Sequence, residues 1–325
     1  MSEPAFITLP RAAPNLAPDP VGVAVLIPCC NEELTIGAVV AGFRAALPDA
    51  RVYVYDNNSR DATVAVGTAA GAVVRHEQRQ GKGYVVARMF SDIEADVYVL
   101  VDGDDTYDAS QAPALIRYLL DNRLDLVNGM RVGSHERRGH RFGNELFNRI
   151  AGRIFGSRFD DMLSGYKVLS RRFVKSFPTL TTGFEIETAL TVHALRLHMP
   201  VAELPTRYRA RPRGSVSNLH TVSDGLRILW AIFLLIKGER PLAFFSSIAA
   251  VLAALSVGLG APIVSTYFTT GLVPRLPTAV LSVGIMMLAF LSLASGLILD
   301  TVTQGRTEVR RLHYLALPAP GSADF

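Results

Sequence analysis

The hydrophobic pattern of residues 21–130 alternates between short apolar runs and longer stretches with helical spacing. The apolar runs predict strands at 21–28, 51–56, 72–76, 96–102 and 124–130. The stretches between them predict helices at about 33–47, 61–71, 81–93 and 110–121. Short apolar strands separated by helices indicate a parallel sheet that is covered on both faces. The pattern therefore predicts an α/β domain, whereas residues 131–225 are less regular.

Two long uncharged stretches near the C-terminus set this chain apart from a purely soluble α/β protein. No residue between Arg240 and Arg275 carries a charge, and none does between Arg275 and Asp300. Each stretch exceeds the about 20 residues that a helix needs to cross the hydrocarbon core of a bilayer. We predict transmembrane helices at about 242–268 and 276–299, with a buried hairpin of a soluble protein as the alternative.

Basic residues are unevenly distributed around these two stretches. Three precede the first stretch within 227–240 and three follow the second within 306–311, whereas the loop between the stretches holds only Arg275. By the positive-inside rule, both flanks are expected in the cytoplasm. We therefore expect a multi-pass protein of the inner (cytoplasmic) membrane with a cytoplasmic N-terminal domain. Residues 1–20 are rich in proline and lack the apolar core of a signal peptide.

The expected organisation of the chain follows from these patterns. Residues 222–238 are apolar enough to lie in the headgroup region of a membrane. The formal net charge of +4 is modest, and we attribute its membrane-proximal part to lipid headgroups rather than to nucleic acid. The expected segments are a flexible leader (1–20), a cytoplasmic α/β domain (21–221), an interfacial helix (222–240), two transmembrane helices (241–300) and a cytoplasmic tail (301–325).

An acidic cluster follows the fourth predicted strand. Asp102, Asp104, Asp105 and Asp108 lie close together in the sequence, and like charges this close repel one another unless a cation lies between them. Carboxylate oxygens suit Mg²⁺ or Mn²⁺, which bind through one or two carboxylates and through substrate phosphates. Asp102 and Asp104 are therefore the candidate metal ligands, and a solvated acidic turn is the alternative.

Two further features lie at the carboxyl ends of predicted strands, where parallel sheets bind ligands. Asp56 can accept hydrogen bonds from a base or a ribose, although residues 57–59 also fit a turn. The Gly-Lys-Gly run at 81–83 opens a predicted helix, whose N-terminus attracts phosphate. It is not a Walker A loop, because His76 stands where that motif requires glycine. The three features together point to a nucleotide diphosphate.

The order of these and later motifs resembles family 2 glycosyltransferases of the GT-A fold. The matching runs are VLIPCCNEE (25–33), VYVYDNNSRDAT (52–63), GKG (81–83), VLVDGDD (99–105), VNGMR (127–131), DMLSGYKVLSRR (161–172), GFEIE (183–187) and YRARPRGSVSNL (208–219). With two spans after them, the layout looks like the polyprenyl-phosphate glycosyltransferases, which include dolichol-phosphate mannose synthase and bactoprenol glucosyltransferases. The resemblance covers roughly residues 21–311.

This resemblance implies a fold and a reaction. The fold is a GT-A (Rossmann-like, mostly parallel sheet) catalytic domain, followed by an interfacial helix and a two-helix transmembrane hairpin. The reaction is the transfer of one sugar from a UDP- or GDP-sugar to a polyprenyl phosphate, with inversion, on the cytoplasmic membrane face. The expected partners are the nucleotide-sugar, the polyprenyl phosphate and membrane lipids, without nucleic acid; a homo-oligomer is left open.

The resemblance also assigns roles to residues by their position in the motifs. Asp102 and Asp104 would flank the Mg²⁺ or Mn²⁺ ion that bridges the donor diphosphate. The implied donor-binding residues are Pro28, Asn31, Glu32, Asp56, Lys82 and Asp102. The implied acceptor-phosphate residues are Arg131, Ser164, Arg211 and Arg213. The family often carries DDGSxD where this chain has DNNSRD at 56–61, which leaves the donor nucleotide open.

The candidate catalytic residues are Asp104, Arg131 and Asp161. Asp161 stands where relatives carry a candidate base, which a sugar hydroxyl acceptor would need. A phosphate monoester has its second pKa near ~6 and is largely a dianion at pH 7, so its oxygen is already nucleophilic. We therefore expect Asp161 to position its loop or an arginine, and a role as base stays open. Glu185 and Glu187 precede a predicted helix, where acids favour the N-terminus, and a supporting role near the acceptor is also open.

Arginines alternate at 207, 209, 211 and 213, just before the membrane segments. Guanidinium groups suit phosphate, although a solvated basic strip is the alternative. Three rival functions are a polysaccharide synthase, a nucleotidyltransferase and a non-catalytic membrane scaffold. The synthase motif QxxRW is absent, because the only tryptophan, Trp230, follows Leu229. A nucleotidyltransferase would release pyrophosphate, and the intact Asp-Gly-Asp run at 102–104 argues against a scaffold.

Overall fold

The structure is a computed structural model of the whole chain. It describes residues 21–132, 152, 159–178, 186–210, 230, 233–234 and 237–321. The leader at 1–20, most of the expected interfacial helix, and Arg211 and Arg213 lie outside the described residues.

A seven-stranded sheet forms the centre of the N-terminal domain, with the strand order β3-β2-β1-β4-β6-β5-β7. The strands are β1 (Val23–Cys29), β2 (Arg51–Asp56), β3 (Val73–His76), β4 (Val97–Leu100), β5 (Leu126–Val132), β6 (Lys167–Ser170) and β7 (Val201–Arg207). β6 runs antiparallel to both of its neighbours, and the other four pairings are parallel. The predicted mostly parallel sheet is therefore confirmed.

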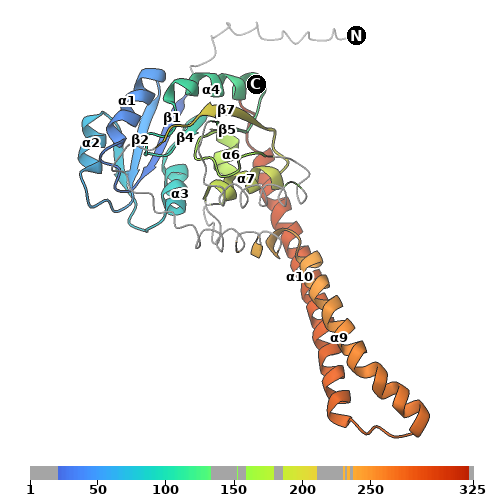
Figure 1. Cartoon of the computed structure of the whole chain (residues 1–325). Coiled ribbons are helices and arrows are strands. Elements are labelled where there is room, and N and C mark those ends of the chain that lie inside the picture. The colour runs from blue at the N-terminus through green and yellow to red at the C-terminus, as the bar shows by residue number, and fades with distance from the viewer. Residues whose placement is uncertain are drawn as a thin grey trace, which may run out of the picture.

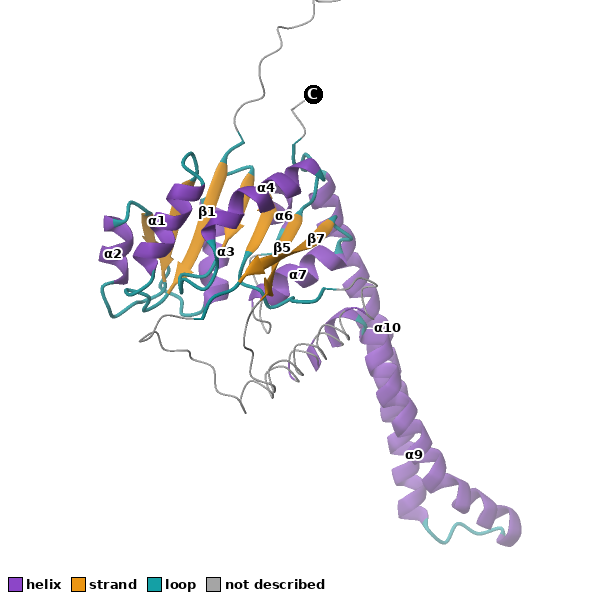
Figure 2. Ribbon diagram, turned by 45° about the horizontal axis from the view of Figure 1, so that its top comes forward, coloured by secondary structure: helices purple, strands orange, loops and turns teal. Residues whose placement is uncertain are grey.

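Helices cover both faces of this sheet (Figure 2). They are α1 (Ile36–Ala46), α2 (Thr63–Ala69), α3 (Lys82–Asp92), α4 (Ala112–Asp121), α6 (Arg171–Ser176) and α7 (Ile186–Arg196), with a short 3-10 helix η1 (Ala109–Gln111) before α4. Alternate residues of a strand point to opposite faces. Val25 and Ile27 of β1 therefore pack with α1 and α4, whereas Leu26 packs with α3, α6 and α7.

Every strand and helix predicted before residue 131 is present, with ends that differ by a few residues. The elements β6, α6, α7 and β7 lie in the less regular stretch after residue 131, where the sequence predicts only a helix near Glu187, the later α7. The parallel arrangement brings the carboxyl ends of β2 and β4 to one edge of the sheet, because both strands pair with β1 in the same direction. Asp56 and Asp102 lie at this edge.

Two long helices, α9 (Pro241–Thr270) and α10 (Leu276–Leu315), form a hairpin that projects away from the domain (Figure 1). Both are long and apolar enough to cross a membrane, by length and composition. The left-handed Gly271, with φ 67°, ends α9 and donates its N–H to Tyr267 O at 2.8 Å. Within the hairpin, the Ser256 hydroxyl donates to Ser282 O at 2.7 Å.

The helix α10 continues beyond its apolar part and returns to the N-terminal domain (Figures 1 and 2). Residues 301–315, which we expected as part of a tail, therefore belong to this helix. Near its end, the buried Tyr314 donates its hydroxyl to Asp125 Oδ2 at 2.7 Å. Arg172 binds the same carboxylate at 2.6 and 2.8 Å, and its guanidinium lies 4.7 Å from the centre of the Tyr314 ring. The C-terminal turns of α10 are thus anchored in the domain.

We predict that Tyr314→Phe lowers the free energy of unfolding, because the substitution removes one donor from the fully buried Asp125. Leaving such a group short of a partner costs about 1–3 kcal/mol. Thermal or urea unfolding of the purified protein measures the loss. The matched control is Tyr118→Phe on α4, where the side chain is 40% exposed. Equal midpoints for the two variants would contradict the anchoring role.

Candidate active site

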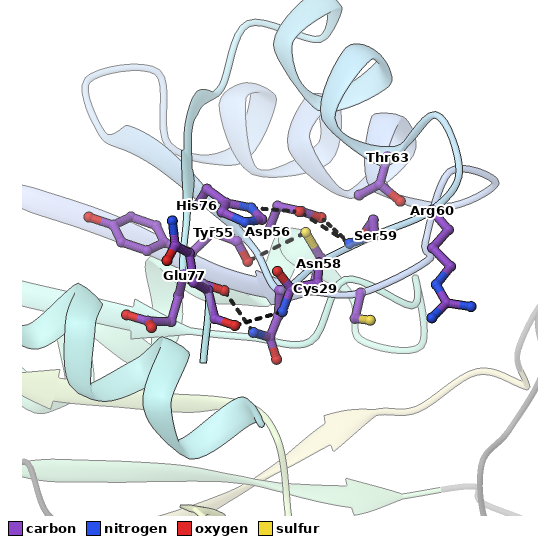
Figure 3. Close-up of polar contacts among 12 residues, drawn as sticks. Cys29, Tyr55, Asp56, Asn58, Ser59, Arg60, Thr63, His76 and Glu77 are labelled. Atoms are coloured by element: carbon purple, nitrogen blue, oxygen red, sulfur yellow. Dashed lines mark hydrogen bonds and ion pairs between the residues drawn. The ribbon is translucent and has the colours of Figure 1, made fainter. Parts of the chain in front are cut away.

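Asp56 is buried at the end of β2. Its carboxylate accepts the Ser59 N–H at 3.2 Å, and its Oδ2 lies 3.0 Å from His76 Nδ1 at the end of β3 (Figure 3). In the register of the sheet, Asp56 lies opposite Cys29 of β1. Asp56 therefore stands at the sheet edge with its carboxylate oriented by two neighbours.

Asn57 and Asn58 replace the second aspartate and the glycine of the related DDGSxD motif. The Asn57 amide donates to Glu77 O at 2.9 Å and Arg79 O at 2.8 Å, and its oxygen accepts the Gly81 N–H at 2.7 Å. An aspartate could not donate these bonds. Asn58 has φ 63°, a left-handed conformation that asparagine tolerates better than most residues do. The two asparagines tie this loop to the start of α3.

The loop after β1 is fastened to the loop after β2. Asn31, with φ 58°, donates its N–H to Ser59 Oγ at 2.9 Å, and its side-chain oxygen accepts the Arg60 N–H at 2.8 Å. The Glu32 N–H donates to Thr63 Oγ1 at 2.8 Å. Three of the predicted donor residues, Asn31, Glu32 and Asp56, therefore come from two joined loops. Pro28 is buried within β1.

Asp102 and Asp104 follow β4 at the same sheet edge. The Asp102 side chain is 28% exposed, whereas Asp104 is buried and accepts the Thr106 N–H at 3.2 Å and the Thr106 hydroxyl at 2.6 Å. Gly165 packs against Asp102, since a Cβ at Gly165 would lie only 2.3 Å from Asp102 Oδ2. A larger residue at position 165 would displace the Asp102 carboxylate, and glycine lets the loop before β6 pack against the acidic cluster.

Lys82, at the start of α3, contacts both Asp102 and Glu187 with its ammonium group. Burial alone would lower the pKa of Lys82, but the two carboxylates raise it above its usual value. Burial raises the pKa of Asp102, Lys82 opposes this shift, and Glu187 and Asp104 add to it. Glu187 therefore lies near the acidic cluster and is paired with Lys82. This pairing could not be deduced from the position of Glu187 at the start of a helix.

The acidic cluster fits a divalent cation by the chemistry of its donors. Asp102 and Asp104 offer hard oxygen ligands at one strand end. Burial is the main cause of the raised pKa of Asp102, and the repulsion from Glu187 and Asp104 that adds to it is the kind that a cation relieves. Within the described residues, no group of three or more His, Cys, Asp or Glu side chains is arranged to hold a metal. An ion bound here would therefore complete its shell with phosphate oxygens and water.

Arg131, near the end of β5, and Asp161 form a bidentate ion pair. The Arg131 Nε and Nη2 groups donate to the two Asp161 oxygens, both at 2.8 Å, and the Arg131 backbone N–H donates to Asp161 Oδ2 at 3.1 Å. Burial would raise the pKa of Asp161, but the bonds and charge of Arg131 lower it below its usual value. Asp161 is thus held as a carboxylate that fixes the guanidinium plane.

Ser164 is fully buried, and its hydroxyl donates to Gly129 O at 2.5 Å while accepting the Tyr166 N–H at 3.2 Å. In this position Ser164 holds the loop between Asp161 and Gly165. The predicted acceptor residues Arg211 and Arg213 lie outside the described residues. The chain leading to them begins beside the acidic cluster, because the Arg209 N–H donates to Thr106 O at 2.8 Å.

Two aromatic rings, those of Tyr107 and Tyr208, lie between the acidic cluster and Arg131. Tyr107 and Tyr208 form an isolated β-bridge, and their ring centres lie 5.2 Å apart. The Tyr107 hydroxyl accepts the Gly165 N–H at 2.8 Å, and the Arg131 guanidinium lies 5.6 Å from the centre of the Tyr208 ring. Tyr107 and Tyr208 therefore connect Gly165, which packs against Asp102, with Arg131.

Comparisons with known proteins agree with this geometry. Residues 24–176 match the family described as Glycosyl transferase family 2. Glycosyltransferase AglJ of Haloferax volcanii is 32% identical over 255 residues, which cover 77% of this chain and 83% of that protein. The chain belongs to glycosyl transferase family 2. The predicted family and the prediction of a glycosyltransferase of the hexosyltransferase type are confirmed.

A further relative and a solved structure differ in what they share with this family 2 glycosyltransferase. A dolichyl-phosphate hexose transferase of Haloferax volcanii is 28% identical over 193 residues, which cover 58% of this chain and 83% of that protein. A crystal structure of glucosyl-3-phosphoglycerate synthase from Mycobacterium tuberculosis, with Mn²⁺ and UDP, has a TM-score of 0.55 and 22% identity, and the match covers 67% of this chain and 79% of that one. The second likeness confirms the predicted GT-A fold.

Proposed function

We propose that this family 2 glycosyltransferase moves a single sugar from a UDP- or GDP-sugar to a polyprenyl phosphate. The product would be a polyprenyl-phosphate sugar, formed with inversion on the cytoplasmic face of the inner membrane. The observation behind the proposal is the ion pair that presents Arg131 beside the acidic cluster, in a chain that continues into two helices of membrane length.

On the donor side, the proposal assigns the nucleoside to the joined loops around Asn31, Glu32 and Asp56. Asp102 and Asp104 would hold Mg²⁺ or Mn²⁺, which would stabilise the charge on the departing diphosphate. Lys82 already lies against Asp102, so its ammonium is within reach of the same diphosphate. The complex of glucosyl-3-phosphoglycerate synthase with Mn²⁺ and UDP supports a nucleotide donor for this fold.

On the acceptor side, the phosphate itself is the nucleophile. One of its oxygens forms a bond to the anomeric carbon while the bond from that carbon to the diphosphate breaks, and the nucleoside diphosphate leaves. A phosphate dianion has no proton to lose, so the chain needs to orient the oxygen rather than to deprotonate it. Arg131 suits this task because Asp161 fixes its guanidinium plane. The dolichyl-phosphate hexose transferase is a relative whose name includes a lipid phosphate.

Labelled sugar transfer tests this function directly. Membranes containing the protein would receive a panel of radiolabelled UDP- and GDP-sugars together with a polyprenyl phosphate. We expect label from one of these donors to move into the organic phase as an acid-labile lipid-linked sugar, with release of the nucleoside diphosphate. Membranes without the protein are the control. Release of pyrophosphate, or label only in a polysaccharide, would contradict the proposal and favour one of the rival functions.

The proposed orientation can be tested by labelling single cysteines in intact cells. A Cys30→Ala background removes the partly exposed thiol, while Cys29 stays buried. In this background, we expect Thr270→Cys, at the end of α9 next to the hairpin turn, to react with a membrane-impermeant maleimide from outside. We expect Ser2→Cys to react only after permeabilisation. Equal reaction of both cysteines from the same side would contradict a hairpin with cytoplasmic ends.

A further inference from the structure

A row of three polar side chains lies on neighbouring strands of the sheet and contacts the backbone next to Asp161. The row consists of Lys167 on β6, Asn128 on β5 and Glu203 on β7. Asn128 lies in register with both of the others, opposite Lys167 in the antiparallel pairing and opposite Glu203 in the parallel pairing. Neither the hydrophobic pattern nor the motifs assigned a role to these residues.

Lys167 is fully buried. Its ammonium donates to Asn128 Oδ1 at 2.6 Å, and to Thr191 Oγ1 and Met162 O at 3.3 and 3.4 Å. These three acceptors are uncharged, and burial lowers the pKa of Lys167 to about 8. Burial of an ammonium group is unfavourable unless its donors are satisfied. The lysine therefore needs Asn128 and the backbone of Met162 in fixed positions.

Asn128 and Glu203 hold the backbone next to Met162. The Asn128 amide donates to Asp161 O and to Glu203 Oε1, both at 2.7 Å. Glu203 accepts the Asp160 N–H at 2.6 Å and the Asp161 N–H at 3.1 Å. The row thus binds the backbone of residues 160–162 at four points, two N–H groups and two carbonyls. The side chain of Asp161 extends from this backbone and accepts two hydrogen bonds from the Arg131 guanidinium.

A polar row of this kind contributes more to geometry than to stability. Replacing buried charged groups by apolar ones of similar size is often neutral for stability, whereas a satisfied hydrogen-bond network fixes one arrangement. The arrangement fixed here is that of the Asp161 carboxylate, and through it the direction of the Arg131 guanidinium. A loop that shifts slightly would still allow the chain to fold, but it would turn the arginine away from its anion.

We propose that Glu203 is a positioning residue for the acceptor phosphate, acting through the Asp161 backbone on Arg131, with Asn128 and Lys167 as its supports. This role rests on the proposed function, in which Arg131 binds the phosphate of a polyprenyl phosphate. Glu203 itself contacts the loop and not the acceptor. Its loss therefore affects acceptor binding and leaves donor binding unchanged.

The substitution Glu203→Gln tests this role without a change of volume. The amide NH₂ of glutamine would face a backbone N–H that the carboxylate now accepts, so at least one bond to the loop is lost. We expect the KM for polyprenyl phosphate to rise about tenfold, equivalent to about 1.4 kcal/mol, with the KM for the nucleotide-sugar and the melting temperature nearly unchanged. The matched control is Glu94→Gln, in the loop between α3 and β4, where the side chain is 65% exposed.

A double-mutant cycle with Arg131→Ala separates positioning from a general structural effect. If Glu203 acts through Arg131, adding Glu203→Gln to Arg131→Ala should leave the acceptor KM where Arg131→Ala alone puts it. Additive effects, or a lower melting temperature with an unchanged acceptor KM, would overturn the inference. Glu203→Ala provides a second variant that should show the same selective rise in acceptor KM.

The failure of this inference can be told apart from the failure of the proposed function. If the wild-type protein does not transfer sugar to polyprenyl phosphate, the proposed function is wrong and the role of Glu203 falls with it. If the wild type transfers sugar and Glu203→Gln has the acceptor KM of the Glu94→Gln control, only the role of Glu203 is wrong.

Discussion

Asp104→Asn and Asp102→Asn are each expected to reduce turnover by about 10²–10³-fold, the loss that follows removal of one group that stabilises transition-state charge. Both residues lie at the end of β4, and the amide that replaces either carboxylate keeps its size but not its charge. Asp104 is buried and accepts two bonds from Thr106. An asparagine oxygen can still accept them, so the fold is expected to survive.

The measurement is the rate of sugar transfer at saturating donor and acceptor, with circular dichroism to confirm folding. Asp121→Asn, at the exposed end of α4, is the matched control and should retain full activity. EDTA should abolish transfer by the wild type, and an excess of Mg²⁺ or Mn²⁺ should restore it. Undiminished activity in excess chelator would show that the carboxylates do not act by holding a metal.

Arg131→Ala is expected to reduce kcat/KM for the acceptor by about 10²-fold, while the affinity for the nucleotide-sugar stays nearly constant. The arginine is 18% exposed at its side chain and is paired with the more buried Asp161. In the proposed function the guanidinium binds the acceptor phosphate, and removing one partner of a buried, hydrogen-bonded charge pair between two binding partners costs about 2–5 kcal/mol of affinity. The partial exposure of Arg131 brings the expectation toward the lower end. Arg131→Lys is the control that separates charge from geometry, because lysine keeps the positive charge but cannot form the bidentate hydrogen bonds.

Asp161→Asn distinguishes a positioning carboxylate from a catalytic base. We expect this variant to slow transfer but to keep the acidic limb of the pH–rate profile, because a phosphate dianion needs no base. If the variant instead loses all turnover, keeps both substrate affinities and is rescued by an external base such as formate, then Asp161 is the base.

The ion pair also predicts how stability depends on pH. Arg131 lowers the pKa of Asp161 below the ordinary value of 3.8. The stabilisation by the pair is therefore complete above that ordinary value and is lost as the pH falls through the lowered one. The difference in melting temperature between wild type and Asp161→Asn should accordingly shrink in strong acid.

The predictable part of the site consists of residues that end strands or lie within contiguous motifs. Asp56 and Asp102 could be placed at one sheet edge because the apolar runs before them predict parallel strands, and parallel strands share their carboxyl edge. Arg131 and Asp161 could be named from the motif order. The sequence predicts that Asp161 positions its loop or an arginine, but it does not say which arginine, because the pairing with Arg131 depends on where β6 enters the sheet.

The unpredicted part depends on contacts between distant segments. β6 is a short strand that lies between β4 and β5. The hydrophobic pattern of the residues around it does not predict that position. From the sequence, Lys167 therefore looks like an ordinary lysine of a strand. Only the order of the strands places Lys167 beside Asn128, and Asn128 beside Glu203. Glu187 reads as a favourable acid at a helix start, and its contact with Lys82 arises only when α3 and α7 pack on the same face.

The continuous α10 has a mechanical consequence for the proposed enzyme. At about 1.5 Å per residue, its 40 residues make a rod of about 60 Å, roughly twice the ~30 Å thickness of a hydrocarbon core. If the apolar half of α10 lies in a bilayer, its other half forms a rigid connection to the domain, because Tyr314 near its end is hydrogen-bonded to Asp125. The length of this half of α10 then sets the distance between the membrane surface and the sheet edge that carries Asp56 and Asp102. Inserting a single residue between the apolar part and Tyr314 would raise the domain by about 1.5 Å and turn it by about 100°, so that the arginine would face a different sector of the membrane surface.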